Sequence, residues 1–180
     1  MHEVYSLFFK KFPTLKELYV ADEAELREII RPLGLEIVRA TILKRLAGEL
    51  AKHHGGTVPC DEEQLLQLPG VGRYAANATR CFAFGKRAAL VDVNVIRVIN
   101  RVFGVTSKKP RARDDPLIWS FVEEHLLPLK NFESFNLALL DFAATICRKR
   151  IPKCGICFAT SYCAYFQRLA SGQDGSQEGS

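Results

Sequence analysis

A tight, glycine-containing turn most constrains how this chain can fold. It reads Leu68-Pro69-Gly70-Val71-Gly72, with helix-like runs at 61–67 before it and 73–84 after it. Glycine tolerates positive φ angles and carries no Cβ, so the backbone can turn sharply and approach another molecule closely. Amides at the start of the second helix point outward from a positive dipole end, which favours anions. The stretch predicts a helical hairpin that binds phosphate.

Apolar residues elsewhere recur at helical spacing, and no stretch alternates as a strand would. The expected helices cover 2–12, 22–30, 36–53, 92–104, 114–127 and 132–146. We expect the first of them to bury Tyr5 and Phe9 with its other apolar residues. Residues 171–180 are polar or small and are expected to be disordered. The fold class is therefore predicted to be all-α.

Composition narrows the range of partners. The 180 residues are enough for one domain or two small lobes, and no apolar run approaches the ~20 residues that span a bilayer. The N-terminus lacks the features of a signal peptide, so we expect an intracellular, cytoplasmic protein with no membrane contact. We also expect the protein to be a monomer. The net charge is +5, which permits nucleic-acid binding. Basic residues gather near the hairpin and the late cysteines: Arg73, Arg80, Lys86, Arg87, Arg97, Arg101, Arg148, Lys149, Arg150 and Lys153. A DNA-binding surface and an ordinary solvated basic face both explain them.

Four late cysteines form the strongest metal-binding pattern. Cys147, Cys154, Cys157 and Cys163 are separated by six, two and five residues. Disulfides are rare inside cells, so these thiols favour a metal group. Structural zinc and a [4Fe–4S] cluster are both chemically reasonable with four thiolates. The spacing alone leaves the two open. Cys60 and Cys81 are expected to be ordinary thiols.

Taken together, these residues resemble the helix-hairpin-helix DNA glycosylases of the endonuclease III superfamily. The resemblance rests on the LPGVG turn, on Val91-Asp92 opening the next helix, and on the cysteine spacing after Asp141-Phe142-Ala143-Ala144. It implies a two-lobed, all-α fold with a helical-barrel lobe at 1–86 and an iron–sulfur lobe at 87–170. It also favours a [4Fe–4S] cluster, held by the four late cysteines, over zinc.

The resemblance assigns chemistry to Asp92. Cleavage of an N-glycosidic bond builds positive charge on the sugar, and a carboxylate can stabilise that charge or orient water. Asp92 matches the family's catalytic aspartate, and Asn94 is expected to contact the same sugar. The plainer interpretation of Asp92 is a helix N-cap, and the two roles are compatible. Tyr74 stands where bifunctional members carry a lysine, and tyrosine cannot form a Schiff base. A packing role for Tyr74 is the alternative.

Further residues are expected to contact DNA. The resemblance assigns phosphate binding to the hairpin, and the candidate residues are Leu68, Gly70, Val71, Gly72 and Arg73. Leu35, after Gly34, resembles the apolar wedge that fills the duplex when a base is flipped. A core leucine at a helix start is an equally good interpretation of Leu35.

The resulting hypothesis is a monofunctional DNA N-glycosylase of base excision repair that acts on double-stranded DNA containing a mispaired base, in association with the nucleoid. Thymine or uracil opposite guanine is the favoured target, and adenine opposite 8-oxoguanine or guanine is the alternative. Family members carry further N-terminal helices before the point that matches residue 1. A truncated, non-catalytic DNA-binding module therefore remains a third possibility.

Overall fold

The computed structural model describes residues 2–172, and across this range every regular element is a helix. The all-α prediction is confirmed. The chain divides into two compact units, Met1–Ala76 and Asn77–Ser180, and the division falls within helix α6 (Arg73–Phe84). This point precedes the boundary expected after residue 86, and the functional assignment of the two lobes stays a prediction. Residues 173–180 of the predicted disordered tail lie outside the described residues.

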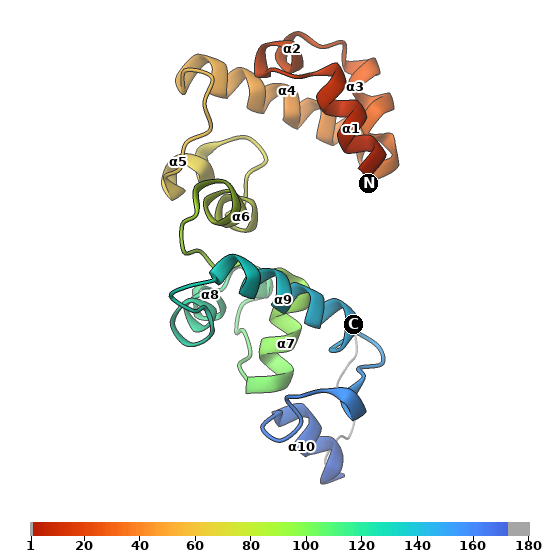
Figure 1. Cartoon of the computed structure of the whole chain (residues 1–180), viewed down its shortest axis with the longest axis vertical. Coiled ribbons are helices and arrows are strands. Elements are labelled where there is room, and N and C mark those ends of the chain that lie inside the picture. Colours follow the sequence, from red (N-terminus) through yellow and green to blue (C-terminus); the bar gives the residue numbers. More distant parts are fainter. Residues whose placement is uncertain (1, 173–180) are drawn as a thin grey trace. The chain divides into compact units, whose positions relative to one another are not determined.

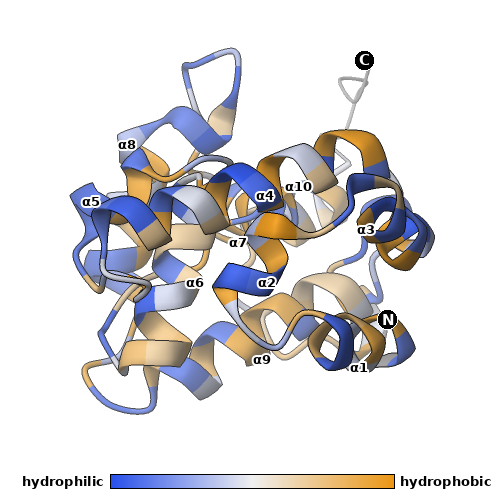
Figure 2. Ribbon diagram, turned by 90° about the horizontal axis from the view of Figure 1, so that it is seen from above, coloured by the Kyte–Doolittle hydropathy of each residue, from blue (hydrophilic) through white to orange (hydrophobic). Residues whose placement is uncertain are grey.

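The first unit is built on one long helix. Helices α2 and α3 pack along α4, and α1 packs on α3. Their shared core includes Phe12, Leu26, Ile30 and Ala40, all nearly inaccessible to solvent. Each of these helices carries both hydrophobic and hydrophilic residues (Figure 2), as amphipathic helices that pack on one face do. The elements are α1 (His2–Lys11), α2 (Leu15–Val20), α3 (Glu23–Ile30), the 3-10 turn η1 (Arg31–Leu33), α4 (Glu36–His53) and α5 (Glu62–Gln67) (Figure 1).

Two expectations about the start of the chain need correction. Tyr5 and Phe9 are 65% and 50% exposed, so the expected burial of these rings is wrong. Helix α2 was also not expected. The sequence nevertheless contains a start signal for this helix, because Thr14 and Glu17 form a reciprocal capping box.

The second unit surrounds helix α7, which packs against α9 and α10. Its largest core joins α7 to α8 and includes Ile99, Ile118 and Trp119. The π-helical turn η3 continues α8, so the expected single helix at 114–127 is made of two differently wound parts. The elements are α7 (Val93–Phe103), η2 (Ala112–Asp114), α8 (Pro116–Phe121), η3 (Val122–Leu126), α9 (Phe132–Thr145), η4 (Cys154–Ile156) and α10 (Ala164–Ala170) (Figure 1).

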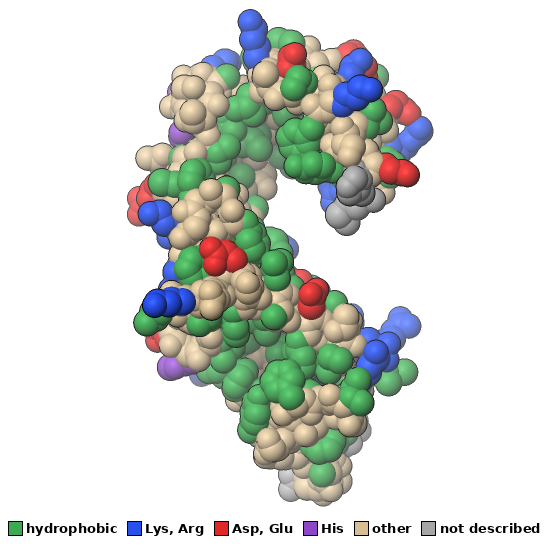
Figure 3. Space-filling model, in the orientation of Figure 1, with side chains coloured by type: hydrophobic (Ala, Val, Ile, Leu, Met, Phe, Trp, Pro, Cys, Tyr) green, Lys and Arg blue, Asp and Glu red, His purple; other side chains and the backbone are tan. Residues whose placement is uncertain are grey.

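Hydrophobic side chains are exposed on both units, as the space-filling view shows for one face (Figure 3). Leu35 in the first unit and Ile151 and Phe158 in the second are each more than 70% exposed. Among the described residues, no helix combines the length and the apolar character that membrane crossing needs.

Candidate functional site

The predicted hairpin forms in the first unit. Asp61 caps α5 by accepting a hydrogen bond from the Gln64 amide at 3.0 Å. After α5, the Val71 amide bonds to the Leu68 carbonyl at 3.1 Å and closes the turn. The Leu68 side chain is 4% exposed and packs in a cluster with Leu50, Leu65 and Ala76. Leu68 therefore anchors the hairpin, and only its backbone could reach a ligand.

The structure explains the presence of glycine at the two turn positions, 70 and 72, in different ways. Gly70 has a φ of +76°, and a Cβ there would lie 2.3 Å from Ile42 Cγ2 on α4. Only glycine fits that position without strain. Gly72 is exposed, and a Cβ there would meet no protein atom within 4 Å. Its carbonyl accepts the Ala76 amide at 2.9 Å, so Gly72 begins α6. The open side of Gly72 is suited to close approach by a ligand.

Arg73 and Tyr74 form the first turn of α6. The Arg73 guanidinium lies 3.8 Å from the Glu62 carboxylate, and its side chain is 36% exposed. Tyr74 is 41% exposed. Both side chains are accessible at the positive end of a twelve-residue helix.

Leu35 adopts a conformation that is uncommon for leucine. It has φ +53° and ψ +31°, in the left-handed region, and stands at the N-cap of α4. The Arg39 guanidinium braces the turn through the Leu33 carbonyl at 2.8 Å. Leu35 is 71% exposed, so its interpretation as a core residue is wrong. Functional sites often retain a residue of this kind, whose backbone is strained and whose apolar side chain is exposed.

In the second unit, Asp92 is fixed at the N-cap of α7. One carboxylate oxygen accepts the amides of Asn94 and Val95 at 2.9 and 2.8 Å. The other accepts the Asn94 side-chain amide at 2.7 Å. Both oxygens of the half-buried carboxylate thus have a defined direction. The N-cap role is confirmed, and Asn94 touches the carboxylate itself.

Arg97 continues this network toward the cysteines. Its guanidinium donates to the Asn94 side-chain oxygen at 2.9 Å, to the Cys147 carbonyl at 3.0 Å and to the Ala143 carbonyl at 2.7 Å. Arg101, one turn later, donates to the carbonyls of Arg148 and Lys149 at 2.7 and 2.9 Å. It is only 4% exposed and lies against the Tyr165 ring. The sequence interpretation of Arg101 as part of a DNA-facing surface is therefore wrong.

The four late cysteines line one small cavity of about 20 Å³ beside Arg101. Cys147 and Cys163 are each 8% exposed. Burial, followed by the proximity of Cys157, Cys163 and Cys147, raises the pKa of the Cys154 thiol, while Arg101 opposes this rise. Residues 2–172 contain no group of three His, Cys, Asp or Glu side chains arranged for a metal ion. Four cysteines that line one cavity beside a buried cation nevertheless have the chemistry that suits an anionic thiolate-bound group.

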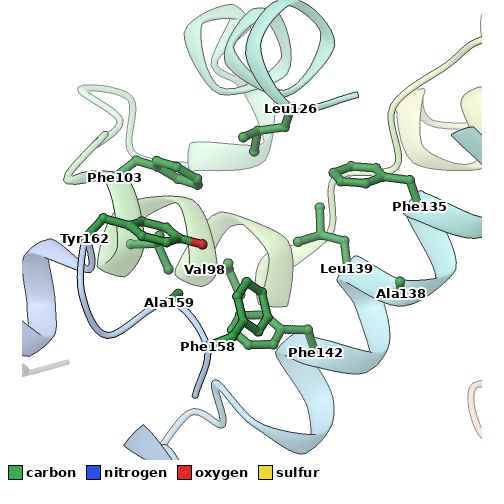
Figure 4. Close-up of a pocket in the computed structure, with 11 residues that line it drawn as sticks. Val98, Phe103, Leu126, Phe135, Ala138, Leu139, Phe142, Phe158, Ala159 and Tyr162 are labelled. Carbon is green, nitrogen blue, oxygen red and sulfur yellow. The ribbon is translucent and has the colours of Figure 1, made fainter. Parts of the chain in front are cut away.

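A second, larger cavity in this unit is apolar. It has a volume of about 300 Å³ and lies between α7, α9 and the cysteine loop. Phe103 from α7, Phe135 and Phe142 from α9, and Phe158 and Tyr162 from the loop line it (Figure 4). None of its lining residues is an Asp, Glu, His, Lys or Arg, and the Tyr162 hydroxyl is the one side-chain polar group among them.

Sequence reasoning missed two buried asparagines, Asn77 and Asn136, both 0% exposed. They hydrogen-bond the backbone just before Asp92. The only signal in the sequence was the residue type, because an asparagine that is buried must find hydrogen-bond partners for its side-chain amide. The other thiols behave as expected, with Cys60 exposed and Cys81 buried.

Comparisons with known proteins agree with this architecture. Residues 1–122 match the HhH-GPD superfamily of base excision DNA repair proteins. The chain belongs to this family. A thymine/uracil-DNA glycosylase of Pyrobaculum aerophilum is 42% identical over 169 residues, covering 92% of this chain and 73% of the relative. A thymine-DNA glycosylase of Aeropyrum pernix is 41% identical over 165 residues, covering 91% and 74%.

A solved structure of a thermostable thymine-DNA glycosylase superposes with a TM-score of 0.85 at 39% identity. The match covers 92% of this chain and 75% of that one. The similarity therefore includes both compact units and extends through most of each protein.

Proposed function

We propose that this protein is a DNA N-glycosylase of base excision repair that removes thymine or uracil mispaired with guanine. The observation that carries the proposal is the Asp92 carboxylate, with both oxygens held by α7. The similarity to thymine and thymine/uracil-DNA glycosylases, at 41% and 42% identity, supports the choice of base.

Asp92 would act on the sugar of the target nucleotide. As the N-glycosidic bond breaks, the sugar acquires oxocarbenium character, which an adjacent carboxylate stabilises. Asn94 would keep that carboxylate from rotating, because it binds one oxygen through its amide and the other through its side chain. Thymine and uracil leave as anions, so this chemistry does not require an acid to protonate the base.

Strand cleavage is not part of the proposed activity. A lyase step needs an amine that attacks the sugar and forms a Schiff base. Tyr74, which is accessible on the first turn of α6 where bifunctional members carry a lysine, has no amine. We therefore assign base release alone, leaving an abasic site.

Double-stranded DNA is the proposed partner. The exposed hairpin at Gly70 and Gly72, with Arg73 beside it, would bind backbone phosphate. Leu35 would replace the flipped base in the duplex, which its exposure and constrained backbone support. An intracellular protein associated with the nucleoid follows from such a substrate.

We also propose that the four late cysteines hold a [4Fe–4S] cluster. When bound, it would serve as a covalent cross-link that stabilises the loop between α9 and α10. Iron, sulfide and zinc analysis of anaerobically purified protein tests this. Four iron per chain is expected for the wild type, loss of iron for Cys154→Ser, and no loss for Cys60→Ser. One zinc in place of iron would overturn the assignment.

The test of the proposed activity is a single-turnover assay on duplexes containing T·G, U·G, A·G and A·8-oxoguanine. Release from T·G and U·G is expected. Asp92→Asn should slow release on the order of 100-fold or more, because it removes the charge while keeping a cap. The matched control is Asp22→Asn, which changes the N-cap of α3 in the same way without the proposed chemistry.

Each other result has a definite meaning. If adenine is the only base released, adenine rather than thymine or uracil is the target base. If a cluster-loaded protein binds abasic DNA but releases no base from any of the four duplexes, the protein is a DNA-binding module rather than a glycosylase. An Asp92→Asn variant as active as Asp22→Asn would remove Asp92 from the chemistry.

A further inference from the structure

The segment that precedes Asp92 is a buried, non-helical stretch, and no strand pairs with it among the described residues. Residues 85–92 form no helix, and Ala88 to Val91 are at most 3% exposed. Buried backbone N–H and C=O groups need hydrogen-bond partners. Since the described residues contain no sheet, side chains can supply the partners that a neighbouring strand would otherwise provide.

The side chains of this segment alternate between two cores. Ala88 and Leu90 pack in one cluster with Cys81. Ala89 and Val91 pack in the other, which contains Trp119. A shift of the backbone by one residue would send each side chain to the opposite face. The register of the segment is therefore a structural requirement, and Asp92 comes directly after it.

Two buried asparagines hold the backbone of this segment. Asn136, on α9, donates from Nδ2 to the Ala88 carbonyl at 2.9 Å and accepts the Leu90 amide at Oδ1, at 3.1 Å. Asn77, on α6, donates from Nδ2 to the Ala89 carbonyl at 2.9 Å. Both side chains are 0% exposed.

The pattern resembles pairing between β-strands. In an extended chain, the carbonyl of Ala88 and the amide of Leu90 point to one edge, and the carbonyl of Ala89 points to the other. Asn136 thus takes the place of one residue of a neighbouring strand, and Asn77 occupies the opposite edge. Together they form what we call the asparagine clamp, which grips three successive residues from both sides.

We propose that Asn77 and Asn136 are positioning residues that set the place of the Asp92 carboxylate by fixing the register of residues 88–90. The inference rests on the proposed function of Asp92. Only Val91 lies between the clamp and Asp92, and it is 1% exposed in the packed core. If the backbone at Leu90 shifts, Asp92 should therefore shift with it, because the single packed residue between them cannot compensate for the movement.

Variants that remove the hydrogen bonds while keeping side-chain size test this. Asn136→Leu removes both backbone bonds on one edge, together with the Asn136 contact to Cys81 Sγ at 3.4 Å. Asn77→Leu removes the backbone bond on the other edge, together with the bond that Asn77 accepts from Arg80 at 3.3 Å. Ile118→Val is the control, because Ile118 packs in the same core as Ala89 and Val91. Its loss of one methylene loosens that core without removing a backbone hydrogen bond. All variants are compared at temperatures where circular dichroism shows them folded.

The first readout separates chemistry from binding. Asn136→Leu should slow single-turnover release of uracil from a U·G duplex on the order of 10- to 100-fold, the usual effect of a small misplacement. Its Kd for an abasic-site duplex should stay at the wild-type value. Asn77→Leu should show a smaller loss, and it also serves if Asn136→Leu does not fold. A rate equal to that of Ile118→Val in both clamp variants would overturn the proposal.

The second readout does not depend on activity. Hydrogen exchange at the amides of Asn94 and Val95, which bond to Asp92, should be faster in both clamp variants than in Ile118→Val. If the wild type releases no base, the proposed function fails, and this exchange alone decides on the clamp. Exchange at the control rate overturns it, and faster exchange supports it.

Discussion

The carboxylate of Asp92 and the backbone carbonyl of Cys147 are joined by two side chains. Asn94 donates to Asp92 at 2.7 Å and accepts from Arg97 at 2.9 Å, and Arg97 donates to the Cys147 carbonyl at 3.0 Å. Residues 55 positions apart in the chain, 147 against 92, are thus held in one network. The proposed catalytic group and the first cysteine of the proposed cluster site are mechanically connected.

Arg97→Lys should therefore affect both ends of the network. Lysine keeps the charge but lacks the planar fork that reaches Asn94, Ala143 and Cys147 together. We expect the variant to be less stable by about 2 kcal/mol, to release base more slowly, and to lose iron faster on exposure to air. Arg148→Lys, a change at an exposed arginine, is the control. An Arg97→Lys protein that matches this control in all three respects would show that the network carries no function.

Alanine at the two hairpin glycines should separate folding from binding. Gly70→Ala combines a positive φ with a contact at 2.3 Å to Ile42, so we expect the first unit to unfold more easily. Gly72→Ala meets no protein atom and should fold normally. If phosphate approaches that open side, Gly72→Ala will still bind DNA more weakly. Wild-type DNA affinity in Gly72→Ala, measured by fluorescence anisotropy, would contradict the proposed phosphate contact.

Tyr74→Lys should introduce an amine where a Schiff base can form. We expect borohydride to trap this variant on DNA after base release, and strand cleavage to appear without alkali. Tyr74→Phe should release base without trapping, since it retains the ring and removes only the hydroxyl. Trapping of the wild type would overturn the assignment of a monofunctional enzyme.

Leu35→Gly should separate stability from activity. Glycine relieves the left-handed conformation that costs leucine roughly 1–2 kcal/mol, so the variant should unfold at no lower temperature than the wild type. Base release should fall, because the proposed wedge is gone. Leu33→Ala removes a neighbouring partly exposed leucine and should leave release unchanged. Full activity in Leu35→Gly would assign the wedge elsewhere.

Asp115 should make the second unit sensitive to acid. The Ser107 hydroxyl, which donates to Asp115 at 2.7 Å, holds the pKa of that carboxyl below its usual value. Burial acts in the opposite direction, and the amides of Leu117 and Lys108 lower the pKa further. A depressed pKa contributes stability above the unfolded value of about 3.9, and this stability is lost as the pH falls through the folded value.

Asp115→Asn should therefore lower Tm at neutral pH, and the difference from wild type should shrink as the pH falls below about 5. Asp114→Asn changes the exposed neighbouring carboxylate and should show no such convergence. A Tm difference that stays constant with pH would mean that the Asp115 charge contributes nothing.

Local signals predicted much of the fold. Asp92 at the start of α7 and Gly104 at its end are strong cap residues, and the structure places both as caps. The turn that contains Pro69 and two glycines is a local signal of the same kind, and it predicted the hairpin. Helix α10 was missed because its seven residues follow the cysteines without a side-chain cap. Tyr5 and Phe9 show the converse error, since apolar spacing cannot tell which side of a helix finds a partner.

Long-range polar partners could not be predicted in the same way. Asn136 meets Ala88 and Leu90 across 48 and 46 residues, and Arg97 meets Cys147 across 50. Such contacts depend on how α7 and α9 pack, which no local pattern encodes. Arg101 was misjudged for this reason, because its charge suggested a surface while its partners are buried carbonyls.

Trp119 makes the second unit spectroscopically distinct. It is the chain's single tryptophan, it is 2% exposed, and its indole donates to the Arg113 carbonyl at 2.8 Å. It shares a core with Ala89 and Val91. Its fluorescence therefore follows the unfolding of the second unit alone, whereas circular dichroism follows helices throughout the chain. Comparing the two melting curves would reveal whether the two halves of the protein lose their structure as one cooperative system.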